Sequence, residues 1–403
     1  MIQDPYLIFS MIIGILGMCV VLFLRRWILS QPVVDEKTRE VASWIKEGAR
    51  AFLKREFMTI LYFIVGISIA LGLLAVYEIM PIQILIGFLI GSFLAIGMAW
   101  IGMETATDAN MRTTEAARKD PIKAFKIGYR GGAVTGLALV SLALLGISVL
   151  FMVFEDPSLV VGFGFGASLA ALFAQLGGGI YTKSADIGAD LVGKVEQRLE
   201  EDDPRNAGVI ADQVGDNVGD CAGRASDLFE SFSDNIISIM IIGAFIATVI
   251  FHKSISEIMP FILLPLVLQA IGLIASIVGV FFTFHKDPTK AVSLSYIVTG
   301  LITVAGFIAT IHIIITPLEP LINDFGLAER LMVSSIIGLV GSLLTVFLVL
   351  YYTGYTRKPV QEVALMAKGG AALDVLAGLA LGMESAFPEA IVIGIVILSA
   401  FFV

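Results

Sequence analysis

The sequence predicts an all-α protein in which residues 1–403 form a single transmembrane domain, a polytopic bundle of transmembrane helices. Hydrophobic residues make up 57% of its 403 residues and charged residues only 15%, and the mean hydropathy is +0.92. This composition excludes disordered chains and ordinary soluble domains. The 40 glycines fit helices that pack closely in lipid, where small residues let two backbones approach each other. No nucleic-acid partner is expected.

Ten apolar segments along the chain are long enough to cross a bilayer, whose hydrocarbon core of ~30 Å needs about 20 apolar residues per helix. The predicted spans are 5–29, 57–79, 82–107, 131–154, 158–195, 208–251, 258–283, 291–316, 328–353 and 371–403. The first is not a cleaved signal peptide, because the positive residues follow its apolar run instead of preceding it. Pro388 predicts that the last is either one kinked helix or a short segment followed by a second, cut-off one.

Lys and Arg residues are concentrated in alternate links between these spans. Twenty-four of the 26 lie in residues 25–56, 108–130, 183–224, 284–290 and 354–370. The opposite side has only Lys253 and Arg330. Cytoplasmic loops carry an excess of Lys and Arg. We therefore expect a cell-membrane protein with its amino terminus outside and residues 196–207 in the cytoplasm.

The remaining polar residues narrow the chemistry. Cys19 and Cys221 lie in apolar or helical context and are interpreted as packing residues, with no disulfide framework. The three histidines are scattered, so a histidine-based metal site is not expected. The net charge of −9 is local, because thirteen of the 35 acidic residues lie between Asp186 and Asp234.

Two long spans, 158–195 and 208–251, carry these acids on helical stripes. The second span has six at helical spacing on one face: Asp212, Asp216, Asp220, Asp227, Glu230 and Asp234. The first has Asp186, Asp190 and Lys194 at successive fourth positions, with Gln175 and Lys183 on the same side. We expect the two polar stripes to face each other across a cavity.

A solvated helix face is the simplest explanation for Asp212 and its neighbours. It does not explain Asp227, Glu230 and Asp234, because an apolar run follows them and intramembrane carboxylates mark ion pathways. Stacked carboxylates repel each other, so cations are expected between them. Oxygen ligands without His or Cys suit Mg²⁺. Residue chemistry favours a metal–polyanion site over a bare cation pathway and leaves both open.

Four motifs carry a resemblance to the membrane-bound, ion-pumping pyrophosphatases. They are "GGGIYTKSADIGADLVGKVE" (177–196), "EDDPRNAGVIADQVGDNVGDCAGRASDLFES" (201–231), "DANMRTTEAARKD" (108–120) and "YYTGYTRKPVQEVA" (351–364). The resemblance covers the whole chain. It implies sixteen helices in two rings, a homodimer, hydrolysis of Mg-pyrophosphate at the cytoplasmic face and outward pumping of H⁺ or Na⁺.

The resemblance also implies residue roles. Pyrophosphate is expected to contact Lys183, Lys194, Asp186 and Glu201. Mg²⁺ is expected at Asp186, Asp190, Asp212, Asp216 and Asp220, with Asp220 binding the attacking water and Asp216 and Lys194 also catalytic. The ion gate is expected at Asp227 and Glu230, with Gln175 where many members have Arg, and with Asp234 as either a further acid in the path or a lipid-interface residue.

The family continues for six more helices, so the resemblance implies an amino-terminal portion that is inactive alone and has a separate carboxy-terminal half as a candidate partner. The choice between H⁺ and Na⁺ and any K⁺ dependence stay open. Two rival hypotheses remain: a passive cation channel or exchanger that uses the intramembrane acids, and a degenerate scaffold that pairs with full-length partners.

Overall fold

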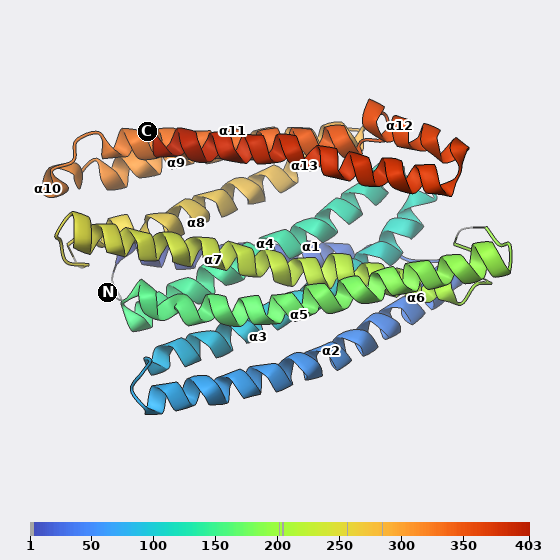
Figure 1. The fold of residues 1–403 in the computed structure, drawn as a ribbon, viewed down its shortest axis with the longest axis horizontal. Coiled ribbons are helices and arrows are strands. Elements are labelled where there is room, and N and C mark those ends of the chain that lie inside the picture. Colours follow the sequence, from blue (N-terminus) through green and yellow to red (C-terminus); the bar gives the residue numbers. More distant parts are fainter. Residues whose placement is uncertain (1–3, 201, 204, 256, 284) are drawn as a thin grey trace. The chain divides into compact units, whose positions relative to one another are not determined.

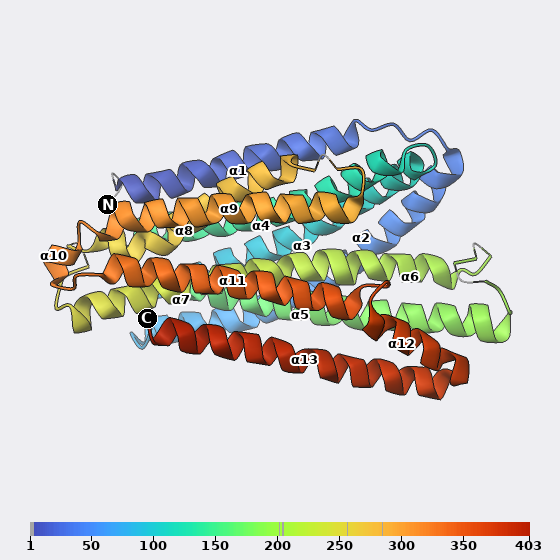
Figure 2. The same ribbon diagram turned by 90° about the horizontal axis from the view of Figure 1, so that it is seen from above.

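The computed structural model describes residues 4–403 apart from 201, 204, 256 and 284, and these described residues form helices and links without a strand (Figures 1 and 2). Ten helical segments among them are long and apolar enough to cross a membrane. The predicted fold class and number of spans are therefore confirmed.

The chain divides into two compact units, Met1–Thr299 and Gly300–Val403. The first contains α1 (Pro5–Leu29), α2 (Glu36–Val76), α3 (Ile82–Ala117), α4 (Pro121–Phe154), α5 (Pro157–Asp190), η1 (Leu191–Glu196), α6 (Gly208–Asp216), η2 (Asn217–Gly223), α7 (Arg224–Phe245), η3 (Ile246–Ile250) and α8 (Met259–Phe281). Helix α9 (Pro288–Ile315) passes from the first unit into the second. The second continues with α10 (Glu319–Ile322), α11 (Leu327–Thr353), α12 (Lys358–Met366), η4 (Ala367–Gly369) and α13 (Ala371–Phe401). The prediction of a single transmembrane domain stays a prediction.

Four of the long helices, α1, α4, α5 and α9, begin at an Asp-Pro pair. Asp4, Asp120 and Asp156 each precede a proline and accept hydrogen bonds from backbone N–H groups of the first turn. The aspartate satisfies donors that the helix itself leaves unpaired, and proline is tolerated at this position because its missing N–H is not needed there. These pairs explain why α1, α4 and α5 begin where they do.

Several helices extend beyond the predicted spans, all for the same reason. Helix α2 begins at Glu36, before the span predicted from 57, α3 continues to Ala117, and α4 begins at Pro121, before the span predicted from 131. The extensions carry charged residues, and a search for apolar runs stops at such residues even where the helix continues. Pro388 lies inside the single helix α13, so the last span is one helix in the structure.

Close backbone contact between α3 and α5 forms part of the core of the first unit. A side-chain carbon added at Gly91 would lie 1.9 Å from the carbonyl oxygen of Phe163, and one at Gly166 would lie 1.9 Å from that of Phe88. Neither position has room for any other residue. Small residues at helix–helix contacts of this kind are typical of membrane bundles.

A buried ion-pair network joins α2 to α3. Glu104 is 5% exposed. It accepts two hydrogen bonds from the guanidinium of Arg50, and its Oε2 lies 3.0 Å from Nζ of Lys46. The same Lys46 nitrogen lies 2.6 Å from Oδ1 of Asp108. The four side chains hold two long helices in register.

An apolar cluster beside this network joins α2 and α3 to α6 and η2. Its buried members are Ala49, Leu53, Ala99, Met103, Val214, Val218 and Ala222. The opposite side of α6 and η2 packs on α5, and Figure 1 shows α5 running alongside α6 and α7. The helix that carries the acidic stripe is thus held between α5 and the α2–α3 pair.

The second unit is a smaller group of helices in which α11 and α12 both pack against α13. Gly341 of α11 lies against the side chain of Val396, and the hydroxyl of Tyr352 donates a 3.5 Å hydrogen bond to Glu384. None of the predicted site residues lies in this unit.

Candidate functional site

A pocket of about 410 Å³ lies where α5 faces α6 and η2. We call it the acidic pocket. Its lining residues are Gln175, Gly179, Thr182, Lys183, Asp186, Asp212, Asp216, Gly219, Asp220 and Arg224. The structure therefore brings the two polar stripes together, as expected from their spacing.

A narrow cleft adjoins the acidic pocket toward the α5–α6 link. It is lined by Asp190 and Lys194 together with Glu200, Asp202 and Asn206, and it shares Asp186 and Asp212 with the acidic pocket. All of the predicted substrate and metal residues therefore line one of the two spaces, except Glu201, which lies outside the described residues.

The charges in these two spaces are only partly compensated. Nζ of Lys183 lies 2.6 Å from Oδ2 of Asp186, and Nζ of Lys194 lies 2.9 Å from Oδ1 of Asp190. Within the described part of the chain, Asp212, Asp216 and Asp220 form no ion pair. Three negative side chains therefore line the wall of one pocket without a cation of their own.

The donor set fits Mg²⁺ bound together with a phosphate ligand better than a metal cage made by protein alone. No three His, Cys, Asp or Glu side chains of the described residues converge closely enough to hold a metal ion. Mg²⁺ usually keeps several waters and is bound by one or two carboxylates plus substrate phosphates. The carboxylates around the acidic pocket can supply that number, and no His or Cys is among the described residues that line it.

The acidic stripe is not one straight row. Helix α6 ends at Asp216, the residues Asn217–Gly223 form a π-helical turn, and α7 starts at Arg224. A π-turn contains more residues than an α-turn, so a projection at constant angle fails across it. The first three acids line the acidic pocket, whereas Asp227, Glu230 and Asp234 lie farther along on α7.

The glycines of the two motifs are explained by packing. A carbon added at Gly178 would lie 2.7 Å from the carbonyl oxygen of Val218, and one at Gly219 would lie 2.3 Å from Oγ1 of Thr182. Oγ1 of Thr182 also lies within hydrogen-bond distance of the carbonyl oxygens of Gly178 (2.8 Å) and Gly215 (2.7 Å). These contacts place the lysine and acids of α5 directly opposite the acids of α6.

Gly178→Ala is expected to destabilise the protein by about 1–3 kcal/mol, because the added methyl meets backbone atoms that cannot move independently. Gly179→Ala is the matched control, because nothing in the described residues lies within 4 Å of its added carbon. Thermal unfolding of both variants in the same detergent checks this. Equal unfolding temperatures for the two would contradict the packing role of Gly178.

The three acids on α7 have neighbours on α5. Oγ of Ser168 donates a 2.9 Å hydrogen bond to Oε1 of Glu230, and Oδ1 of Asp234 lies against Gly164. Gln175 lines the acidic pocket, and the described residues show no hydrogen bond between it and Asp227. Glu230 is thus the acid of this group that α5 holds by a hydrogen bond.

Three residues of the site were not predicted as such. Thr182 and Ser168 make the contacts described above, and Asn206 donates a 2.8 Å hydrogen bond to the carbonyl of Ala189 while accepting one from the backbone N–H of Gly208. A single polar residue on a helix or in a link gives no periodic signal, so only the fold reveals these bonds. The sequence "DPRNAG" around Asn206 did carry a turn signal.

The α5–α6 link is also tied by charge. Hydrogen bonds from the side chain and backbone of Arg205, together with its positive charge, lower the pKa of Asp203 to about 2. The carboxylate of Asp203 is therefore ionised at neutral pH. The link beside the narrow cleft therefore keeps this ion pair at neutral pH.

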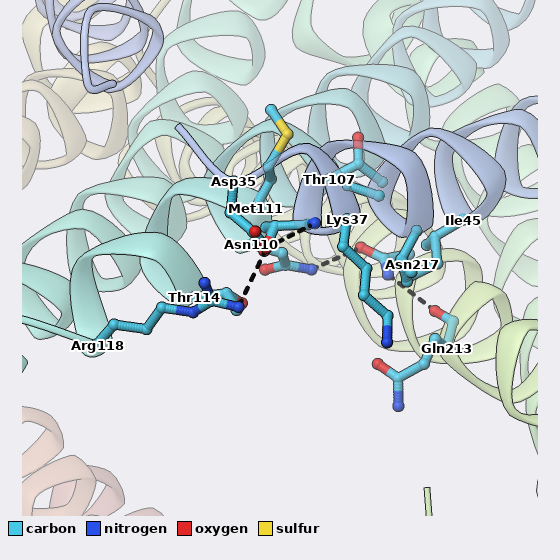
Figure 3. Close-up of a pocket in the computed structure, with 13 residues that line it drawn as sticks. Asp35, Lys37, Ile45, Thr107, Asn110, Met111, Thr114, Arg118, Gln213 and Asn217 are labelled. Carbon is cyan, nitrogen blue, oxygen red and sulfur yellow. Dashed lines mark hydrogen bonds and ion pairs between the residues drawn. The ribbon is translucent and has the colours of Figure 1, made fainter. Parts of the chain in front are cut away.

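A second pocket, of about 380 Å³, lies on the other side of α6, between α2 and α3 (Figure 3). We call it the amide pocket, because Asn110, Gln213 and Asn217 line it. Nδ2 of Asn110 donates a 3.1 Å hydrogen bond to Oδ1 of Asn217, and Nδ2 of Asn217 donates a 2.8 Å hydrogen bond to the carbonyl of Gln213.

Fold and site define a multi-pass α-helical membrane protein with an acid-lined pocket where α5 faces α6 and η2. A family model described as inorganic H⁺ pyrophosphatase matches residues 15–403. The chain belongs to this family, the membrane-bound pyrophosphatases.

Curated relatives point to the same family. The chain is 41% identical over 400 residues to the K(+)-insensitive pyrophosphate-energized proton pump 2 of Moorella thermoacetica, covering 96% of this chain and 56% of the relative. It is 38% identical over 405 residues to the putative K(+)-stimulated pyrophosphate-energized sodium pump of Clostridium tetani, covering 100% and 56%. It is 34% identical over 442 residues to the pyrophosphate-energized membrane proton pump 3 of Arabidopsis thaliana, covering 99% and 54%.

The chain thus spans about half the length of the curated relatives that it matches. The family match, which runs to residue 403, does not support the narrower expectation of an amino-terminal portion, and that expectation stays a prediction.

Proposed function

We propose that the protein containing this chain hydrolyses pyrophosphate at the acidic pocket and couples the reaction to the transport of H⁺ or Na⁺. The observation that carries this proposal is the continuity of the helix formed by α6, η2 and α7, which we call the acidic helix. It presents Asp212, Asp216 and Asp220 to the pocket without ion-pair partners among the described residues. It then continues, through α7, to the hydrogen-bonded Glu230. The family membership and the names of the relatives agree with both halves of the proposal.

In this proposal, residues of α5 and α6 divide the work. The ammonium groups of Lys183 and Lys194 bind phosphate oxygens, after exchanging part of their interaction with Asp186 and Asp190. Asp216 and Asp220 orient the attacking water and accept its proton, and hydrolysis of this kind depends mainly on positioning and charge. Bound Mg²⁺ supplies neutralisation of the phosphate charge.

The acids on α7 are proposed as the gate of the transported ion. Placing a carboxylate inside the membrane costs free energy, and such carboxylates usually mark the path of an ion. Glu230, held by Ser168, and Asp227 form the gate, with Gln175 and Asp234 as its neighbours. The relatives include proton pumps and a putative sodium pump, so both ions remain candidates, and K⁺ is a candidate activator.

We further propose the topology that the distribution of Lys and Arg favours, with the amino terminus outside and the acidic pocket facing the cytoplasm. Because the relatives are about twice as long as this chain, we also propose that residues 1–403 need further helices for full activity. These helices would come from a carboxy-terminal half, either on a separate chain or on the same chain. The complete protein would form a homodimer.

Transport assays in sealed membrane vesicles test the proposed function. We expect hydrolysis that requires both Mg²⁺ and pyrophosphate, together with uptake of H⁺ or Na⁺ that stops when pyrophosphate is withheld. Cation flux of equal size without pyrophosphate would support a passive channel instead.

The need for further helices is tested by comparing residues 1–403 alone with the same residues co-expressed with a relative's carboxy-terminal half. We expect hydrolysis only in the second case. A full rate from residues 1–403 alone would contradict the need for a second half.

A further inference from the structure

The amide pocket is not part of the proposed catalytic site. Its wall from α2 and α3 includes four apolar side chains, and its charged residues are Asp35, Lys37 and Arg118. The acidic pocket, in contrast, is lined by ten residues, of which six are charged: four aspartates, Lys183 and Arg224. The two pockets therefore suit different ligands, although α6 and η2 contribute to both.

Charge in the amide pocket favours a ligand with one anionic group. Hydrogen bonds from the side chain and backbone of Thr38, followed by the charge of Arg118, hold the pKa of Asp35 below its usual range, so this carboxylate is ionised. Arg118 compensates it with a nitrogen 3.1 Å from its Oδ2. Lys37 forms no ion pair or hydrogen bond within the described residues, which leaves one positive charge for a ligand.

Hydrogen-bonding groups in the amide pocket are also left over. The side-chain amide of Gln213 and the hydroxyl of Thr114 make no hydrogen bond with the described residues. The side-chain oxygen Oδ1 of Asn110 accepts no hydrogen bond from them either. Figure 3 shows these side chains together with Lys37 and Arg118 around the pocket. Carboxamides match the paired donor and acceptor atoms on the edge of a purine base.

The apolar wall completes the description of the ligand. Val41, Ala42, Ile45 and Met111 offer a surface on which a flat ring can lie, and about 380 Å³ is within the range for small-molecule sites. Pyrophosphate would leave this wall and the amides unused, and a purely apolar molecule would leave Lys37 and the amides unpaired. We propose that the amide pocket binds a purine nucleoside monophosphate, with the base against the amides and the phosphate at Lys37.

The position of the pocket gives such a ligand a means of regulation. Gln213 lies between Asp212 and Asp216 in the sequence, and Asn217 begins the π-helical turn that ends just before α7. Contacts with these two side chains would therefore act on the helix that presents Asp216 and Asp220 on its other side. This regulatory part of the inference rests on the proposed function, whereas nucleotide binding does not.

Binding of AMP to the purified full-length protein, measured by calorimetry without pyrophosphate, tests the inference. We expect Lys37→Ala and Gln213→Leu each to weaken binding by about 10-fold, equivalent to ~1.4 kcal/mol. Lys183→Ala, in the acidic pocket, should change the Kd less than about twofold. Ribose 5-phosphate and adenosine, which each lack one half of the ligand, should bind more weakly than AMP.

Absence of AMP binding would overturn the inference, as would binding that Lys37→Ala and Gln213→Leu leave unchanged. Binding lost in Lys183→Ala and retained in Lys37→Ala would assign AMP to the acidic pocket and would also overturn it. Unfolding temperatures close to that of the parent protein establish that the variants are folded. Because pyrophosphate is absent, failure here is distinct from failure of the proposed function.

Regulation is tested in a separate experiment. If the two pockets are coupled, AMP changes the affinity for a pyrophosphate analogue, and the analogue changes the affinity for AMP by the same factor.

Discussion

Asp216→Asn is expected to reduce Mg²⁺-dependent binding of a non-hydrolysable pyrophosphate analogue by about 100-fold or more. Asp216 is exposed to the acidic pocket and forms no ion pair in the described part of the chain. Its negative charge is therefore free to hold a cation. Asparagine keeps the shape but removes this charge. Equilibrium binding of the analogue at fixed Mg²⁺, and again after chelation of the metal, measures the effect.

Asp234→Asn is the matched control for this experiment. Asp234 is on α7, against Gly164, and does not line the acidic pocket. The same loss of charge there should leave analogue binding within about twofold of the parent protein. Equal losses in the two variants would contradict the division of the acidic helix into a substrate part and an ion-path part.

Glu104→Gln is expected to destabilise the protein by about 2–3 kcal/mol. The substitution leaves the ammonium of Lys46 and the guanidinium of Arg50 beside a neutral group that can accept fewer hydrogen bonds. Removal of one partner of a fully buried pair costs about 3–5 kcal/mol, and the partial exposure of both cations reduces this. Thermal unfolding should show a midpoint lower by roughly 5 °C.

Glu362→Gln provides the comparison at the surface. Lys358 and Glu362 form an exposed pair 3.4 Å apart, with side chains 83% and 60% exposed. Exposed pairs contribute about 0–1 kcal/mol, so this variant should unfold within roughly 1–2 °C of the parent protein. A midpoint for Glu104→Gln as high as that for Glu362→Gln would show that the network does not hold α2 to α3.

The number and order of the spans could be predicted because each helix must hide its backbone polar groups from lipid and cover the bilayer thickness. The same criterion failed for the start of α2, where Glu36–Glu47 is an amphipathic helical extension and not an apolar run. A helix outside the lipid needs only one apolar face. The amphipathic start of α2 can therefore be recognised only when the helices against which it packs are known, and these are α3 and the acidic helix.

The sequence by itself determined the membrane fold and the positions of the two acidic stripes, because apolar length and the helical spacing of charges are local properties. Its four motifs carried the resemblance to the family. The tertiary structure decided which acids share a pocket. Asp212, Asp216 and Asp220, the last of them in the π-helical turn, line it, whereas the other three acids lie beyond the turn on α7. It also decided that Lys183 and Asp186 face Asp212 across glycine contacts, and that Asn110 of α3 bonds Asn217. Such contacts depend on the distance between helices. Side-chain packing sets this distance, and the spacing of residues along one helix does not reveal it.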